Sequence, residues 1–199
     1  MPTGIALHDP RTRLLEAGER VLLRSGPAGL TSRALTDEAG VAKGVLHRHF
    51  DDLDDFLVGL VRKRAAAVGS VLSGLADEAG RGTVSGNLTA ALIGVFTPLF
   101  LATVRLVLTR DELRARLRGN ESDGLPLLAE AVRGVGAYLA AEQRLGRILP
   151  SAAPDMLAHA LIGTGHLLFA GELGGLPDES GVYEVVEAII VGAEPGASR

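Results

Sequence analysis

The chain has 199 residues, of which 47% are hydrophobic and 22% charged, so it has enough apolar side chains to fill one or two packed domains. It contains no cysteine, which excludes disulfide bonds and cysteine-based metal or nucleophile chemistry. The formal net charge is −4, but residues 1–50 hold seven basic and five acidic side chains, whereas residues 51–199 hold thirteen and nineteen. A mildly basic first part before an acidic remainder is the distribution expected when only the first part touches phosphates.

The sequence shows no sign of export or of a membrane span. It does not begin with a basic segment followed by an apolar run, and its longest apolar stretch, residues 95–108, is broken by Pro98 and Arg105. A helix that spans a membrane needs ~20 successive apolar residues. We therefore expect a cytoplasmic protein that has no membrane partner.

The first predicted helix runs from about Pro10 to Ser25. Asp9 is a typical N-cap residue, and a proline suits the first helical position because its missing N–H would have no partner there. Arg11 and Arg13 lie at the exposed start of this helix, where they can reach phosphates. Ordinary solvated charges explain these two arginines equally well.

Residues 31–50 predict two short helices joined by a sharp turn. Thr31 is an N-cap residue in front of a helical pattern, and Gly40 supplies the turn because glycine adopts positive φ freely. The second helix, from about Lys43 to Phe50, would bury Leu46 and Phe50 and turn its basic and polar side chains outward. Such a pair is typical of a helix-turn-helix, in which the second helix enters the major groove of DNA.

This stretch resembles the DNA-binding segment of the TetR (tetracycline repressor) family. The family pattern is roughly Thr, then Ile-Ala-x-x-Ala-Gly-Val-Ser-x-Gly-Thr-Leu-Tyr-x-Tyr-Phe. The chain has Thr31 and then, over residues 35–50, Leu-Thr-Asp-Glu-Ala-Gly-Val-Ala-Lys-Gly-Val-Leu-His-Arg-His-Phe. The alternative is a chance glycine-turned hairpin in a larger helical protein. Pattern and resemblance together assign DNA contacts to Thr31, Ser32, Arg33, Lys43, Gly44, Val45, His47, Arg48 and His49.

Several positions depart from the family pattern. Ala42 replaces a serine, so the second helix loses an N-cap worth roughly 0.5–2 kcal/mol. Val45 replaces a threonine, so the DNA-facing surface of the helix lacks the threonine hydroxyl. His47 and His49 replace two tyrosines, and Thr36 replaces a small alanine where the two helices cross. The apolar residues that pack the two helices are retained, which supports the predicted fold.

The rest of the chain predicts helices and no strands. Their expected ranges are 53–79, 85–96, 99–117 with an interruption near 109–111, 125–145, 155–173 and 182–191, with a polar loop at 119–124. Asp52 is the expected N-cap of the first of them. The predicted protein is all-α, with a three-helix helix-turn-helix DNA-binding domain at 1–50. A larger helical ligand-binding and dimerisation domain follows at 51–199, linked by the helix at about 53–79.

The last two helices are apolar nearly all round. A helix with that composition needs packing partners on every side. A two-fold four-helix dimer interface explains the pattern, and the resemblance implies the same pairing, while the alternative is the core of a monomer. The predicted interface residues are Leu157, Leu161, Leu168, Val186, Ile189 and Ile190. We expect a homodimer bound to a palindromic operator in double-stranded DNA.

The larger domain also offers candidate ligand-binding residues, each of which could instead be ordinary core. They are Phe96, Phe100, Arg105, Tyr138, His166 and Phe169. Arg105 is the most informative, because a charge inside an apolar run must find a carboxylate, a ligand anion or water. No metal is expected, since His159 and His166 are about 10 Å apart along a straight helix, too far to share one ion.

The predicted function is therefore sequence-specific DNA binding by a transcriptional regulator. The resemblance implies a repressor that is released by a small-molecule effector, whose identity the sequence does not give. The chain has no Gly-rich phosphate loop, no nucleophile elbow and no carboxylate pair in a polar cleft, so we expect no cofactor and no enzyme activity. The alternative is a helical small-molecule-binding protein or enzyme whose helix-turn-helix no longer reads DNA.

Overall fold

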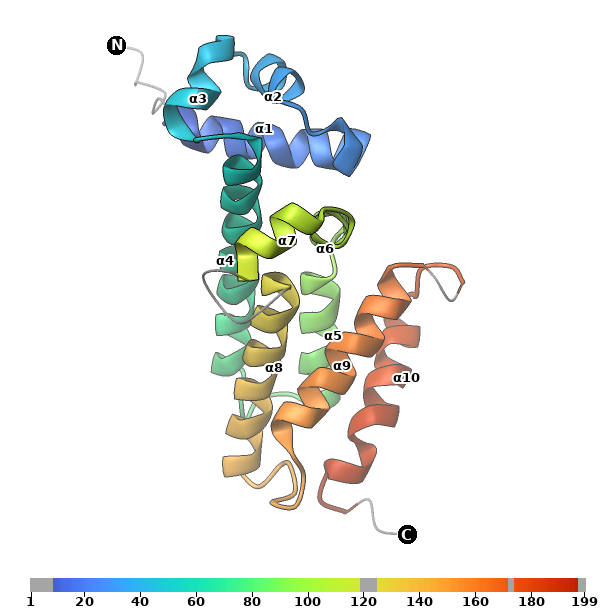
Figure 1. Cartoon of the computed structure of the whole chain (residues 1–199). Coiled ribbons are helices and arrows are strands. Elements are labelled where there is room, and N and C mark those ends of the chain that lie inside the picture. The colour runs from blue at the N-terminus through green and yellow to red at the C-terminus, as the bar shows by residue number, and fades with distance from the viewer. Residues whose placement is uncertain (1–8, 119–124, 172–173, 197–199) are drawn as a thin grey trace, which may run out of the picture. The chain divides into compact units, whose positions relative to one another are not determined.

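The computed structural model describes residues 9–118, 125–171 and 174–196 (Figure 1). These residues form helices and turns without a strand, which confirms the all-α prediction. By packing, the chain separates into two units. Unit 1 comprises residues 1–63 and 102–125, and unit 2 comprises residues 64–101 and 126–199. Helices α4 (Leu53–Asp77) and α6 (Pro98–Thr109) each begin in one unit and end in the other.

Unit 1 contains the predicted helix-turn-helix. Its elements are α1 (Pro10–Ser25), the short 3-10 turn η1 (Pro27–Gly29), α2 (Ser32–Ala39), a second 3-10 turn η2 (Lys43–Val45), α3 (Leu46–His49), the start of α4, the end of α6 and α7 (Asp111–Arg118). Its core is built from leucines of several helices and from Phe56, which is fully buried. The ring of Phe56 meets that of Phe50 edge to face, with centroids 5.1 Å apart. The end of α3 is thereby anchored to the start of α4.

Unit 2 is a bundle made of the end of α4, the start of α6 and four further helices. These are α5 (Val84–Val95), α8 (Pro126–Arg144), α9 (Pro154–Phe169) and α10 (Glu179–Ile190), followed by the 3-10 turn η3 (Val191–Ala193). Helix α8 packs on α9, and α10 packs on both α5 and α9. Gly165 of α9 permits one close approach, because a Cβ at this position would lie 2.5 Å from the ring of Phe96.

Most predicted helix bounds agree with the structure within a few residues. The range predicted at 99–117 is interrupted at Arg110, where α6 ends and α7 begins. The helix predicted at 155–173 is too long, because it ends at Phe169 and Gly171 takes φ +73°. Residues 172–173 and the predicted loop at 119–124 lie outside the described residues. The predicted domains, 1–50 and 51–199, divide the chain by function and stay a proposal.

Candidate nucleic-acid interface

The turn between α2 and α3 is specified by residues close in the sequence. The Thr31 hydroxyl accepts a hydrogen bond from the Ala34 N–H at 3.1 Å and so caps α2. Gly40 has φ +64° and ψ 40°, a left-handed conformation that ends the helix. The buried hydroxyl of Thr36 donates to carbonyl oxygens of its own helix, so this departure from the family pattern leaves no polar group unsatisfied.

The second helix begins as a 3-10 turn and becomes α-helical only at Leu46. Ala42 is its N-cap and makes no side-chain hydrogen bond, as expected for a residue without a polar side chain. Leu46 and Phe50 are buried, which confirms the predicted inward face. The outward-facing side chains therefore lie on a short segment that Leu46 and Phe50 hold against the core.

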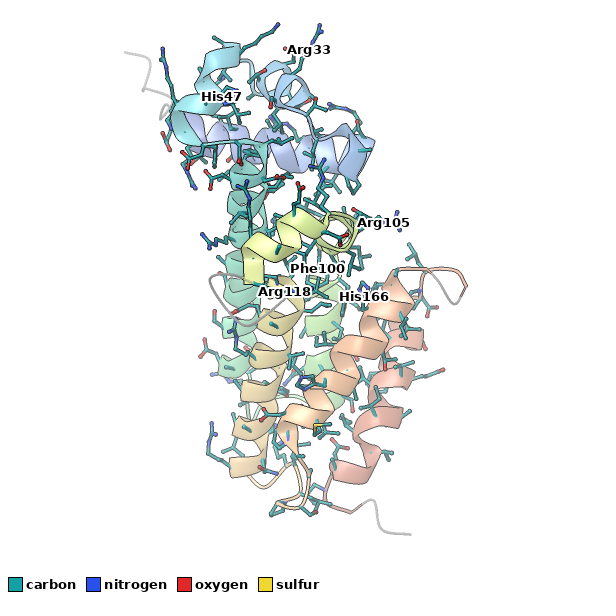
Figure 2. The ribbon with its side chains drawn as sticks, viewed as in Figure 1. Arg33, His47, Phe100, Arg105, Arg118 and His166 are labelled. Carbon is teal, nitrogen blue, oxygen red and sulfur yellow. The ribbon has the colours of Figure 1, made fainter. Side chains whose placement is uncertain are left out.

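The proposed DNA contacts lie on the outside of unit 1. Thr31, Arg33, Lys43, Gly44, His47 and Arg48 are exposed, while Ser32, Val45 and His49 are half-buried. Figure 2 labels Arg33 on α2 and His47 on α3. The three long basic side chains among the proposed contacts, Arg33, Lys43 and Arg48, are all exposed, as contacts with DNA require. The assignment of each residue to a phosphate or a base stays a prediction.

Helix α1 contacts α2 through two ion pairs and one hydrogen bond to a backbone carbonyl. The Glu38 carboxylate pairs with Arg20 at 2.7 Å and Arg24 at 2.8 Å, and these two guanidinium groups lower its pKa. Arg13 donates to the Ala39 carbonyl at 2.8 Å, at the end of α2. Arg11 lies over the Phe50 ring, 4.9 Å from its centroid. Arg13, a candidate for phosphate contact in the sequence, thus has a structural partner.

Four of the six candidate ligand-binding residues form one aromatic cluster in unit 2. The rings of Phe96 and Phe169 are stacked, with centroids 5.3 Å apart, and Phe100 meets Phe96 edge to face at 5.1 Å. His166 lies 6.5 Å from Phe96 between ring centroids (Figure 2). The Nδ1 atom of His166 is buried and has no hydrogen-bond partner among the described residues. A buried polar atom without a partner is costly, so this nitrogen invites a ligand or water.

The other two candidates do not join this cluster. Tyr138 is fully buried, and its hydroxyl donates to Glu142 at 2.6 Å and accepts from Asn87 at 3.0 Å. Burial and the Glu142 hydrogen bond raise the pKa of Tyr138. Arg105 is an exposed residue of unit 1 and needs no buried counter-charge. Neither residue lies in the aromatic cluster, because helical spacing does not tell which face of α6 or α8 is buried, and their part in ligand binding stays a prediction.

Tyr138→Phe should therefore lower the stability of the protein. The substitution leaves the buried Glu142 carboxylate without one donor, and a missing partner of this kind costs about 1–3 kcal/mol. Chemical denaturation of wild type and variant measures the difference in unfolding free energy. Equal unfolding free energies would contradict the structural role of the hydroxyl.

Comparison with known proteins covers both the helix-turn-helix and the whole chain. Residues 14–59 match the family model of the bacterial regulatory proteins of the tetR family. A solved member of the TetR family from Streptomyces coelicolor A3 is 27% identical, with a TM-score of 0.68 over 92% of this chain and 98% of that one. Residues 14–59 therefore match the TetR-family DNA-binding segment, and the whole chain shares its fold with solved TetR-family structures. It has no match among curated proteins.

Two further solved structures resemble this chain. The multidrug binding protein EbrR, solved with imidazole, is 26% identical, with a TM-score of 0.62 over 92% of this chain and 95% of that one. SmeT, the repressor of the Stenotrophomonas maltophilia multidrug efflux pump SmeDEF, is 19% identical. Its TM-score is 0.66 over 96% of this chain and 94% of SmeT. SmeT has also been solved with triclosan. At its level of identity, the likeness to SmeT shows the fold alone.

The helices proposed for dimerisation divide into a buried and an exposed face. Among the predicted interface residues, Leu161, Val186 and Ile190 are buried in their own subunit, and Leu157, Leu168 and Ile189 are half-buried. The first three therefore pack in the core of their own subunit, and the assignment of all six residues to a dimer contact stays a prediction. Apart from Asp155 in its first turn, the exposed stripe of α9 consists of Met156, His159, Ala160, Gly163 and Leu167. Met156 is 67% exposed and Leu167 44%.

Proposed function

We propose that this chain is a TetR-family transcriptional regulator that binds a palindromic operator as a homodimer and is released by a small-molecule effector. The observation that carries the proposal is the helix-turn-helix itself. Leu46 and Phe50 seat the second helix on the core, while Lys43, His47 and Arg48 remain exposed for the major groove. Because the proposed target is DNA, we also propose that the protein acts in the cytoplasm.

A second copy of the chain would supply the second half-site contact. The exposed stripe of α9 combines two large apolar side chains with Ala160 and Gly163, whose small size allows helices to approach closely. Exposed apolar side chains that line one helix face favour association with another apolar surface. We therefore propose this stripe as the dimer contact rather than the buried positions Leu161, Val186 and Ile190.

The effector would bind at the aromatic cluster of unit 2. The half-buried ring of Phe169 offers a flat surface for stacking, and the Nδ1 atom of His166 offers one hydrogen bond. These groups suit a planar aromatic molecule that carries one polar substituent. Triclosan, the molecule bound by SmeT, is a practical first probe of this chemistry.

Electrophoretic mobility shift with the DNA upstream of the protein's own gene tests the DNA-binding part of the proposal. We expect a complex that persists against excess unrelated duplex and dissociates when an effector is added. Binding that unrelated duplex abolishes equally would contradict a sequence-specific regulator. It would instead favour a helical small-molecule-binding protein whose helix-turn-helix no longer reads DNA.

Thermal unfolding with triclosan tests the effector site separately. A ligand that binds only the folded protein raises the unfolding temperature. We expect a rise for wild type and a smaller rise for Phe169→Ala and His166→Ala, with Tyr183→Ala as a control because Tyr183 is an exposed aromatic residue outside the cluster. Equal rises in all four proteins would place the probe elsewhere.

A further inference from the structure

Two arginines beyond the predicted DNA-binding domain contact the turns on either side of the helix-turn-helix. Arg110 lies at the break between α6 and α7, and Arg116 lies on α7. Both belong to unit 1, the unit that contains α2 and α3. Their partners are 83 and 64 residues earlier in the chain, so these are tertiary contacts that local sequence patterns do not encode.

Arg116 binds the turn that leads out of the second helix. Its guanidinium donates two hydrogen bonds to Asp52, at 2.9 Å to Oδ1 and 2.7 Å to Oδ2. The same Oδ1 accepts the Asp55 N–H at 2.7 Å, which confirms Asp52 as the N-cap of α4. Only Phe50 and Asp51 separate this carboxylate from the end of α3. The Asp52 side chain therefore caps the connecting helix α4 and also accepts two hydrogen bonds from the guanidinium group of Arg116 on α7.

Arg110 binds the turn that leads into α2. Its Nη2 donates to the Pro27 carbonyl at 3.2 Å, in the 3-10 turn between α1 and α2. Its Nη1 lies 4.0 Å from the Asp54 carboxylate in the first turn of α4. The segment around α7 thus touches the helix-turn-helix at its entrance and at its exit.

We propose that Arg116, supported by Arg110, is a positioning residue that sets the orientation of the second helix for DNA binding. The inference rests on the proposed function, since orientation matters only if this helix reads DNA. The fork fixes the position of Asp52, and Asp52 fixes where α4 starts relative to α3. A two-pronged contact restricts both position and angle, which a single charge contact does not.

The contact is placed for orientation rather than for stability. The Arg116 and Asp52 side chains are 45% and 49% exposed. Ion pairs this exposed contribute little to the unfolding free energy. Arg116 lowers the pKa of Asp52, with the Asp55 N–H as a second cause, so the pair weakens only as the pH falls through that lowered value. Its effect on DNA binding should consequently be constant from pH 6 to pH 8.

The test measures operator affinity of the full chain on the duplex that shifts in the upstream-DNA experiment. We expect Arg116→Gln to weaken binding about fivefold or more, in the range of typical coupling between sites. The unfolding temperature and the oligomeric state should not change. Arg114→Gln is the matched control, because Arg114 sits on the same helix and donates to Leu108 within the same α6–α7 segment. Equal affinity of Arg116→Gln and wild type would overturn the proposal.

Two more variants separate positioning from a direct phosphate contact by Arg116. Arg116→Lys keeps the charge but loses the fork, so positioning predicts weakened binding and a phosphate contact predicts near-normal binding. Asp52→Asn keeps an N-cap residue and loses the charged partner. If Arg116 acts through Asp52, the double variant Asp52→Asn/Arg116→Gln should bind no worse than either single variant. Additive losses would overturn the proposal, whereas wild type that binds no duplex would refute the proposed function instead.

Discussion

Gly163→Arg should convert the protein to monomers and lower operator affinity by roughly 10²–10⁴-fold, the gain that linking two binding modules typically gives. Gly163 lies in the exposed stripe of α9, and a Cβ there would meet no atom within 4 Å, so the subunit has room for the side chain. Arginine is also a better helix former than glycine. At a two-fold interface the new charge would face its own symmetry copy in an apolar contact.

Light scattering measures the oligomeric state, and the mobility shift measures affinity. Leu176→Arg is the control, because Leu176 is 75% exposed but lies between α9 and α10, outside the stripe. Leu161→Arg is uninformative here, since Leu161 is 1% exposed and a charge at that position would unfold the subunit. A wild-type protein that is monomeric at micromolar concentration would contradict the homodimer, and a dimeric Gly163→Arg would contradict its assignment to α9.

Arg48→Ala should abolish most sequence-specific binding. A base contact by arginine contributes about 1–3 kcal/mol, and a dimer on a palindrome loses it in both half-sites, so we expect a loss of about 2–6 kcal/mol per dimer. The base preference should relax at one position in each half-site. Affinities for single-base variants of the operator provide the measurement.

Lys43→Ala should behave differently because Lys43 is expected to contact phosphate. Binding to all DNA sequences should weaken alike. The slope of log affinity against log salt concentration should decrease by the equivalent of about one phosphate contact per half-site. Arg81→Ala removes an equal charge from an exposed residue of unit 2 and serves as the control. Normal affinity and selectivity in both the Arg48 and Lys43 variants would remove the second helix from its assigned role.

The helix-turn-helix could be predicted because its determinants are local. Thr31 caps the helix that follows it, Gly40 takes the positive φ that its position requires, and Leu46 and Phe50 alternate with exposed residues at helical spacing. Asp52 could be predicted as an N-cap for the same reason. Each of these features depends on neighbours within four residues along the chain.

The second role of Asp52 could not be predicted because its partner is distant in sequence. Arg116 is one of four arginines between residues 110 and 118, and nothing in the sequence distinguishes the one that reaches Asp52. The exposed face of α9 could not be predicted either, because a helix that is apolar nearly all round has no polar side chains that mark its solvent-facing side. The hydrogen bond from Tyr138 to Glu142 could not be predicted either, since a buried hydroxyl with a carboxylate partner has the same sequence spacing as one that faces a cavity.

Selection of bound duplexes from a random DNA pool tests the central claim, that the exposed helix reads a palindromic operator, and it requires no operator of known sequence. The full-length protein is incubated with the pool, and the recovered sequences are compared with those recovered by Arg48→Ala. We predict enrichment of an inverted repeat whose half-sites are about one helical turn, ~34–36 Å, or a multiple of it apart. The variant should lose one enriched base in each half-site. Recovery of no enriched sequence by the wild-type protein would contradict the account.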